Sequence, residues 1–268
     1  MNGGEVRLVT DAASGIATIT LNRPQALNAL DIPMAEGLRA ATARVAADAT
    51  IHAVVIQGAG EHFMAGGDIK AFHDSLDDPP ADRRALLERL IGEVHHAVTS
   101  IREMEKPVIA SVRGAVAGFG FSLMSACDLA IAADSCYFTL AYRHIGTSPD
   151  GGSTYALPRL VGVKQAMEIA LLGERFKAPR ALELGLINRV VPAAELAAAT
   201  QALAQELANG PTIALGRTKR LINESLNRNL AEQLQAEQDS FAACAMTQDF
   251  ARGVRGFVAK QKPGFLGN

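Results

Sequence analysis

The chain has 268 residues, of which 49% are hydrophobic and 20% are charged, and its formal net charge is −2. This length and apolar content suffice for a substantial core, and a near-neutral chain without a basic stripe argues against nucleic acid as the main partner. No apolar run reaches the ~18 residues of a membrane span, the start lacks a signal-peptide pattern, and the three cysteines fit no metal-site spacing. We therefore expect a cytoplasmic protein with no membrane partner and no bound metal.

The first part of the sequence alternates between strand-like and helix-like segments. β-prone residues on both sides of a turn at 12–15 predict two strands, and Pro24 ends the second. Asp31 is predicted to cap a helix, and an apolar strand follows over 52–58. A glycine-rich loop over 59–72 then leads into the next helix. This alternation indicates a parallel sheet layered with helices.

The middle of the sequence continues the same pattern. The polar, proline-bearing segment 73–81 is expected to be mobile, and a long helix follows, roughly Asp82 to Glu105. Its apolar stripe recurs at helical spacing through Leu87, Leu90, Ile91, Val94, Val98 and Ile101. A strand is predicted over 106–114, a buried helix over 117–127 and another strand over 128–134.

After Val191 the pattern becomes helical. Four segments within 192–261 read as helices separated by glycine or proline. We place a domain boundary here, with 1–192 as the catalytic core and 193–268 as a C-terminal helical oligomerisation or cap region. Helices this rich in alanine and apolar residues often pack against another subunit.

Two glycine-rich segments share one design. "FMAGGDIKAF" and "GAVAGFGFSLMSA" each place glycines where a loop beside a strand enters a helix. Such entries expose backbone amides at a helix start, and two amides aimed at one oxygen form an oxyanion hole. The segments lack a phosphate-loop or dinucleotide fingerprint.

A single carboxylate, Asp150, stands between a proline and two glycines in "SPDGGSTYALPRL". The residues from Ser153 onward predict a helix, so this carboxylate is placed near the positive end of a helix. A turn or helix-cap role is one interpretation, because aspartate is common at both positions. A catalytic role is the other.

The sequence resembles the enoyl-CoA hydratase/isomerase (crotonase) superfamily over nearly its whole length. The resemblance runs from "ITLNRPQALNALD" through "AVVIQGAGEHFMAGGDIKAF", "KPVIASVRGAVAGFGFSLMSACDLAIAAD" and "LGLINRVVP" to "GVRGFVAKQKPGF". It implies an α/β fold with a crotonase-like ββα spiral core and a C-terminal helical trimerisation region. It also implies an acyl-CoA thioester substrate, no separate cofactor because coenzyme A is part of the substrate, and a homotrimer or homohexamer.

The resemblance assigns site residues by position. The two amides that bind the thioester oxygen correspond to Gly67 and Phe119, and because the family commonly has glycine at the second position, the Phe119 ring must point away from the thioester. Further positions expected to contact the substrate are Ala65, Gly66, Gly118, Tyr142, Arg23, Phe257 and Lys260.

The resemblance also bears on the reaction. The two glutamates of the hydratases correspond here to Ser122 and Tyr142, neither of which replaces a carboxylate, since a tyrosine of pKa ~10 is almost entirely neutral at pH 7. The single-carboxylate isomerases of the family carry an aspartate that corresponds to Asp150. We therefore expect double-bond isomerisation of an enoyl-CoA, with Asp150 as acid and base.

Two alternatives stay open. The sequence also resembles the 4-chlorobenzoyl-CoA dehalogenases, which implies dehalogenase- or thioesterase-like hydrolysis with Asp150 as nucleophile and His95 activating water. A partly buried helix histidine without a catalytic role is the alternative interpretation of His95. The third hypothesis is a non-catalytic acyl-CoA-binding subunit.

Overall fold

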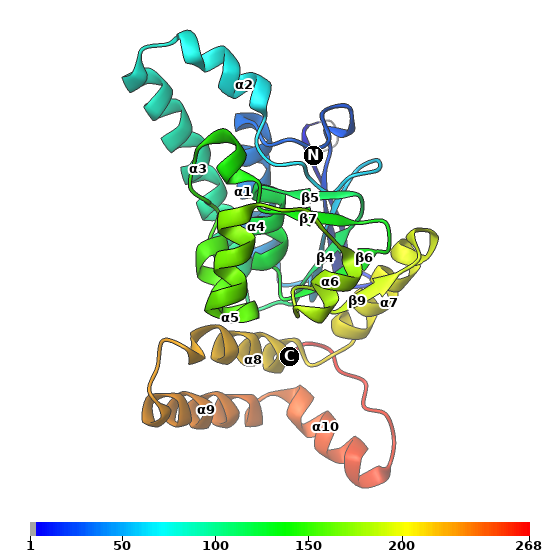
Figure 1. The fold of residues 1–268 in the computed structure, drawn as a ribbon. Helices are drawn as coiled ribbons and strands as arrows, with labels where there is room; N and C mark the ends of the chain where they lie inside the picture. Colours follow the sequence, from blue (N-terminus) through cyan, green and yellow to red (C-terminus); the bar gives the residue numbers. More distant parts are fainter. Residues whose placement is uncertain (1–3) are drawn as a thin grey trace.

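The computed structural model describes residues 4–268, which fold around two β-sheets (Figure 1). The larger sheet has the strand order β1-β2-β3-β4-β6-β9, with β1 antiparallel to β2 and all other pairs parallel. Its strands are β1 (Val6–Asp11), β2 (Ile16–Leu21), β3 (Ala53–Gly58), β4 (Val108–Val112), β6 (Leu129–Ala133) and β9 (Arg189–Val191). The smaller sheet joins β5 (Ala115–Ala117), β7 (Tyr137–Thr139) and β8 (Phe176–Lys177).

The chain passes from the larger sheet to the smaller one twice, as β4 to β5 and as β6 to β7. Each passage is followed by helical structure, which gives the ββα spiral that the sequence predicts. The helices of the core are α1 (Ile32–Ala47), α2 (Ile69–Asp74), α3 (Pro80–Glu103), α4 (Phe119–Ala126), α5 (Ser153–Leu172) and α6 (Ala178–Glu183). Four short 3-10 helices join them: η1 (Pro24–Ala26), η2 (Ser75–Asp77), η3 (Tyr142–Ile145) and η4 (Ala193–Glu195).

The predicted helix starts are set by local capping. The Asp31 carboxylate accepts a hydrogen bond of 2.9 Å from the Met34 amide, which confirms it as the cap of α1. The segment 73–81, expected to be mobile, contains the end of α2, η2 and the beginning of α3. Helix α3 begins at Pro80 rather than Asp82, since proline is well tolerated in a first helical turn.

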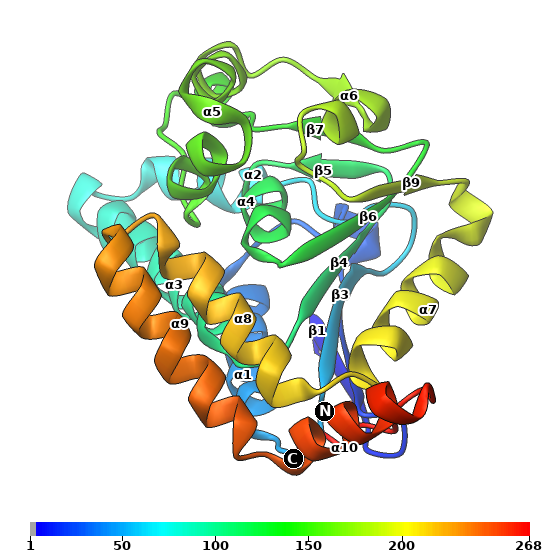
Figure 2. The ribbon, with the colours of Figure 1, turned by 90° about the horizontal axis from the view of Figure 1, so that it is seen from below.

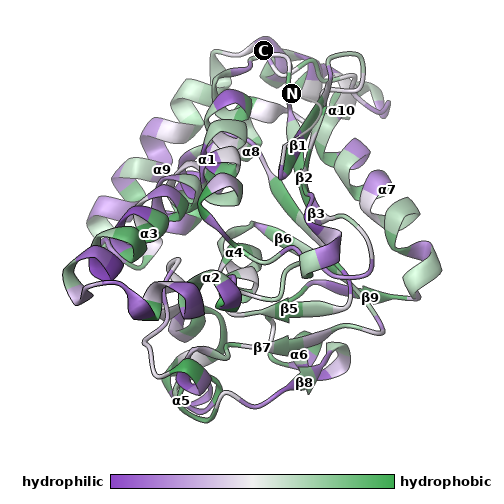
Figure 3. Cartoon of the chain, turned by 90° about the horizontal axis from the view of Figure 1, so that it is seen from above, coloured by the Kyte–Doolittle hydropathy of each residue, from purple (hydrophilic) through white to green (hydrophobic). Residues whose placement is uncertain are grey.

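The strands of the larger sheet form the centre of the core. Every residue of β4 is buried, and β3 is buried from Ala53 to Ile56. Strands covered on both faces read as continuous apolar runs, which is the pattern that the sequence carries here. Apolar colouring accordingly runs along the sheets in Figure 3, whereas the outer face of α3 is largely hydrophilic.

The remaining helices are α7 (Leu196–Ala208), α8 (Thr212–Ser225), α9 (Leu230–Ala245) and α10 (Gln248–Ala259). Helix α7 packs on β3, β4 and β6, whereas α9 and α10 lie beyond α8, away from the sheets (Figures 1 and 2). The boundary between 192 and 193 stays a prediction; in the fold, α7 covers the sheet and α8 to α10 form the outlying layer.

A buried lysine joins this outlying layer to the core. The Lys219 ammonium of α8 pairs with Asp128 at 2.8 Å and donates hydrogen bonds to the carbonyl oxygens of Ile101 and Lys106 at 2.6 and 3.0 Å. Its side chain is 7% exposed. Burial lowers the pKa of Lys219 and raises the pKa of Asp128, while the pairing opposes both shifts.

Replacing Lys219 with methionine is expected to lower the free energy of unfolding by about 3–5 kcal/mol, because it leaves the Asp128 carboxylate buried and uncompensated. Urea unfolding followed by circular dichroism measures the effect. The matched control is Arg220→Met, whose exposed partner Glu105 lies 3.7 Å away and whose loss is expected to cost 0–1 kcal/mol. Equal losses for the two variants would contradict this role of Lys219.

Among the helices of residues 4–268, none combines the length and the apolar character that a bilayer crossing requires.

Candidate active site

The two glycine-rich segments run side by side because hydrogen bonds join them like neighbouring strands. The Phe63 amide donates to the Arg113 carbonyl at 2.9 Å, and the Met64 amide donates to the Ala115 carbonyl at 3.1 Å. The Ala117 amide in turn donates to the Met64 carbonyl at 2.9 Å. This pairing aligns the two loops up to the residues that precede α2 and α4.

Gly66 and Gly118 meet at the end of this pairing. Both have positive φ, +100° and +50° respectively, and a Cβ added to Gly118 would lie 3.1 Å from the Gly66 Cα. Only glycine combines this backbone conformation with so close an approach. The next residues along the two loops, Gly67 and Phe119, therefore stand on adjoining backbone segments.

The amides of Gly67 and Phe119 are candidate oxyanion donors. Phe119 is the first residue of α4, and Gly67 precedes the Asp68 that caps α2. Within residues 4–268, neither amide donates a hydrogen bond to the protein. Two such amides next to each other at helix entries are suited to a developing negative charge on a ligand oxygen.

Replacing Gly118 with alanine is expected to lower the free energy of unfolding by about 1–3 kcal/mol, because alanine is strained at this φ. The methyl group also presses on Gly66 and separates the two loops. Gly92→Ala in α3 is the control, since an added Cβ there meets nothing within 4 Å and helix propensity predicts a gain of about 0.8–1.0 kcal/mol. Urea unfolding of both variants measures the contrast, and a stabilised Gly118→Ala protein would contradict it.

Asp150 lies in a polar cluster formed by three elements. The Tyr142 hydroxyl of η3 donates a short hydrogen bond to Asp150 Oδ1. The Ser122 hydroxyl of α4 donates to the Asp150 carbonyl oxygen at 3.0 Å and lies 3.3 Å from the Tyr142 hydroxyl. The two positions that correspond to the hydratase glutamates thus hold hydroxyl groups, and both contact the one carboxylate-bearing residue.

The turn after Asp150 packs directly on α4. A Cβ at Gly151 would lie 2.7 Å from the Phe119 ring and 2.9 Å from the Ser122 Cβ. The Phe119 ring is therefore buried beneath the turn, at 2% exposure, which places the side chain on the Asp150 side and leaves its amide at the helix start. Helix α4 consequently carries one candidate amide donor and also seats the carboxylate.

Burial raises the pKa of Asp150, while the hydrogen bond from Tyr142 and the charge of His95 lower it in part. Burial also raises the pKa of Tyr142, and the neighbouring Asp150 charge raises it further. Tyr142 is therefore a neutral hydrogen-bond donor at neutral pH. A carboxylate whose pKa is moved toward the working pH is suited to take up and return a proton.

The family model described as enoyl-CoA hydratase/isomerase matches residues 11–268. The chain belongs to the enoyl-CoA hydratase/isomerase family. It is 36% identical over 260 residues to the 1,2-epoxyphenylacetyl-CoA isomerase of Escherichia coli, with 97% of this chain and 98% of the relative covered. It is 30% identical over 254 residues to the trans-2-decenoyl-[acyl-carrier-protein] isomerase of Streptococcus mutans, with 95% of each covered.

Solved structures agree with this assignment. An enoyl-CoA hydratase from Polaromonas sp. JS666 superposes with a TM-score of 0.90 at 32% sequence identity, covering 97% of this chain and 99% of that one. The crotonase-like fold that the sequence predicts is thus confirmed. Relatives of this enoyl-CoA hydratase/isomerase family protein bear both hydratase and isomerase names. The comparisons therefore establish the family, and the reaction has to be inferred from the residues of the site.

His95 of this family member lies on the exposed side of α3. Its charge still lowers the Asp150 pKa, so the two side chains are near enough to interact. The alternative of a partly buried helix histidine is therefore wrong about its burial. Its catalytic role stays a prediction.

The positions predicted to contact the substrate lie in several different parts of the fold. Arg23 uses all three guanidinium nitrogens within the chain, through the carboxylates of Glu5, Asp31 and Asp68 at 3.0–3.2 Å. Phe257 is 87% exposed on α10, and Lys260 ends that helix with a φ of 55°. These contacts stay predictions, as do those of Ala65, Gly66 and Gly118 in the paired loops.

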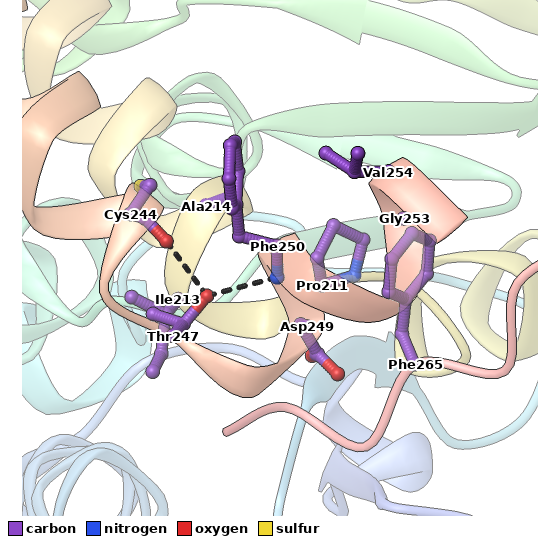
Figure 4. A pocket seen from close by; sticks show the side chains of 10 residues that line it. All are labelled: Pro211, Ile213, Ala214, Cys244, Thr247, Asp249, Phe250, Gly253, Val254 and Phe265. Carbon is purple, nitrogen blue, oxygen red and sulfur yellow. Dashed lines mark hydrogen bonds between the residues drawn. The ribbon is translucent and has the colours of Figure 1, made fainter. Parts of the chain in front are cut away.

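A separate cavity of about 270 Å³ lies between α8, α9, α10 and the C-terminal segment (Figure 4). Mostly apolar side chains line it, and Thr247 beside it caps α10 by accepting a hydrogen bond of 3.1 Å from the Phe250 amide. Its lining includes neither Asp150 nor the residues of the paired loops. The candidate active site is therefore elsewhere in the molecule.

Two features of the site were missed from the sequence. The sequence indicates that Ser122 and Tyr142 lack a carboxylate and that Tyr142 contacts the substrate, but it does not predict that both side chains meet Asp150. The contact between the Phe119 ring and Gly151 was also not predicted. Sequence separation hides these contacts, since residues 122 and 150 are 28 positions apart and only the fold brings them together.

Proposed function

We propose that this protein isomerises the double bond of an enoyl-CoA, with Asp150 as both acid and base. The observation that carries the proposal is the position of Asp150, whose turn packs on the first turn of α4 beside the candidate amide donor of Phe119. Ser122 and Tyr142 supply no carboxylate for the activation of water. One proton carrier beside an oxyanion site is the set of groups that isomerisation requires.

In the proposed reaction the Asp150 carboxylate removes a proton from C2 of a 3-enoyl thioester. The electron pair of the broken C–H bond moves toward the thioester, and the amides of Gly67 and Phe119 stabilise the negative charge on its oxygen. The protonated Asp150 then returns the proton at C4, which leaves the double bond between C2 and C3. The proton balance closes without water, metal or redox cofactor, so coenzyme A enters only as part of the substrate.

Two of the relatives are named isomerases, one for an epoxyphenylacetyl-CoA and one for an acyl-carrier-protein thioester. Their names support isomerase chemistry at a thioester substrate for this chain. The free cysteines, Cys127, Cys136 and Cys244, are consistent with the reducing cytoplasm as its compartment.

His95 favours a second candidate function. The effect of cationic His95 on the Asp150 pKa indicates that the two side chains are neighbours. In its neutral form His95 would take a proton from water for dehalogenase- or thioesterase-like hydrolysis, with Asp150 as the nucleophile. Its exposure on α3 in the single chain weakens this alternative, since a general base is more effective when it is held by neighbours. A binding subunit without catalysis is the remaining alternative.

A panel of thioesters separates these functions. Purified protein is assayed with 3-enoyl-CoA, 2-enoyl-CoA and 4-halobenzoyl-CoA, and conjugated enoyl thioester, hydrated product, free thiol and halide are followed. Isomerisation predicts turnover of 3-enoyl-CoA to 2-enoyl-CoA without hydration. Release of halide or free thiol that requires His95 would favour hydrolysis, and binding of all esters without turnover would favour the non-catalytic subunit.

We also propose that the outlying layer mediates self-association into a homotrimer or homohexamer. Large apolar side chains are exposed along α8, α9 and α10, namely Ile222, Leu226, Leu230, Leu234, Phe241, Met246, Phe257 and Val258. So large an apolar surface is typical of a protein–protein interface.

Light scattering is expected to give a mass three or six times that of the 28.2 kDa chain. Phe241, which is 72% exposed on α9, is replaced with aspartate to place a charge in this surface, and we expect that variant to dissociate. Arg84→Asp, on the exposed part of α3, is expected to keep the wild-type mass. A monomeric wild-type protein would contradict the proposal.

A further inference from the structure

We propose that Tyr142 is a positioning residue for Asp150: its phenol holds one carboxylate oxygen so that the other faces the substrate. The inference rests on the isomerisation proposed above and assigns Tyr142 a role different from the substrate contact predicted from the sequence. Its basis is the hydrogen-bond pattern of the Asp150 cluster. Tyr142 bonds Oδ1, whereas no other residue among 4–268 donates a hydrogen bond to Oδ2.

The tyrosine is itself firmly placed. Helix η3, which carries it, follows Ala141 in the left-handed region with a φ of 53°. The next residue, Arg143, donates hydrogen bonds to the carbonyl oxygens of Leu171 and Leu172 at 2.6 and 3.1 Å, at the C-terminal end of α5. Asp150 stands just before the start of that same helix. Helix α5 is interrupted between these two ends at Gly162, whose φ of 76° and ψ of 161° are not helical. The direct hydrogen bond from the Tyr142 hydroxyl to Asp150 Oδ1 therefore joins the two residues.

Ser122 completes the arrangement from α4. It is 1% exposed, and its hydroxyl contacts both the Asp150 carbonyl oxygen and the Tyr142 hydroxyl. Ser122 lies three residues after Phe119, so both face the Asp150 turn from one side of the helix. Ser122 thus holds the Asp150 backbone, and through Tyr142 it also supports the carboxylate. Both contacts keep Asp150 in a constant place relative to the amide donor at the start of α4, and constant placement of reacting groups is a large part of catalysis.

Loss of the Tyr142 hydroxyl is expected to change the Asp150 pKa in one direction. The titratable groups that act on Asp150 are Tyr142 from η3 and His95 from α3. The side chains that α4 and α5 bring to it are the serines Ser122 and Ser153. The phenol donor lowers the Asp150 pKa by stabilising the carboxylate. Removing the donor therefore raises that pKa, and a base must be ionised to act.

The test compares Tyr142→Phe with Tyr155→Phe in the full chain. Tyr155 lies at the surface of α5 and bonds Asn227, so its loss serves as the matched control. With 3-enoyl-CoA, we expect Tyr142→Phe to lower kcat by about 10–10²-fold with little change in KM. We also expect it to move the acid limb of the kcat/KM profile to higher pH. Tyr155→Phe is expected to match wild type in all three readouts.

A second measurement does not depend on turnover. Carboxyl ¹³C NMR titration, with the Asp150 signal assigned by its absence in Asp150→Asn, is expected to give a higher Asp150 pKa in Tyr142→Phe than in wild type. An unchanged pKa and an unchanged acid limb would overturn the role of Tyr142 while leaving isomerisation intact. If Tyr142→Phe raises the Asp150 pKa but the wild-type protein does not isomerise 3-enoyl-CoA, the proposed function is overturned and the role of Tyr142 stands.

Discussion

Replacing Asp150 with asparagine is expected to lower kcat for isomerisation of 3-enoyl-CoA by about 10²–10⁴-fold, the usual contribution of a positioned general acid and base. The asparagine side chain is nearly isosteric and still offers an oxygen to the Tyr142 hydroxyl. The backbone contact with Ser122 does not involve the side chain and is preserved. Formation of the conjugated 2-enoyl thioester, followed by ultraviolet absorbance, measures the effect.

The free energy of unfolding of Asp150→Asn shows whether a lower kcat comes from lost chemistry or from lost folding. Burial raises the Asp150 pKa above its ordinary value of 3.8, so the native state favours the protonated form. Ionising the buried Asp150 lowers the free energy of unfolding. This loss begins as the pH rises above the ordinary pKa and is complete above the raised pKa of the native state. Asp150→Asn is therefore expected to be at least as stable as wild type at high pH. Asp134→Asn, at an exposed position after β6, is expected to change neither property.

Replacing Phe119 with proline is expected to lower kcat by about 10²–10³-fold, because it removes one of the two candidate oxyanion donors. Phe119 is the first residue of α4, where proline is well tolerated since the amide has no partner within the helix. The matched control is Phe119→Leu, which loses the ring and keeps the amide. Both variants lose the ring contact with Gly151, and only the proline variant loses the amide hydrogen. The ratio of their kcat values therefore measures the effect of the amide donor alone.

The two Phe119 variants are expected to share a loss of stability, since each leaves space beneath the Gly151 turn, and large-to-small changes of a buried ring are costly. Equal kcat values for proline and leucine would show that this amide does not stabilise the transition state. The loss would then belong to the packing of the ring alone.

Local sequence signals located the start of α1 at its Asp31 cap but placed the start of α3 at Asp82 instead of Pro80. Asp31 caps α1 as predicted, because a capping side chain bonds an amide a few residues away. The sequence predicts that both glycine-rich segments enter helices, whereas the close approach of Gly66 and Gly118 is seen only in the fold. The resemblance to the family supplied the rest of the spiral.

The smaller sheet and the buried charge of α8 were not readable from local patterns. Strands β5, β7 and β8 have three, three and two residues, which is too short for a period to emerge. Lys219 looks like one more solvated lysine in "GRTKRLIN", and only the tertiary fold brings it to Asp128. The Tyr142–Asp150 contact depends in the same way on the path of the loop between them.

The most direct measurement is a crystal structure of the Asp150→Asn variant with bound 3-enoyl-CoA. The account predicts that the thioester oxygen lies about 2.7–3.1 Å from the amide nitrogens of both Gly67 and Phe119, with the residue 150 side chain against C2 and C4. A thioester oxygen bound away from either amide, or a residue 150 side chain turned toward solvent, would contradict it.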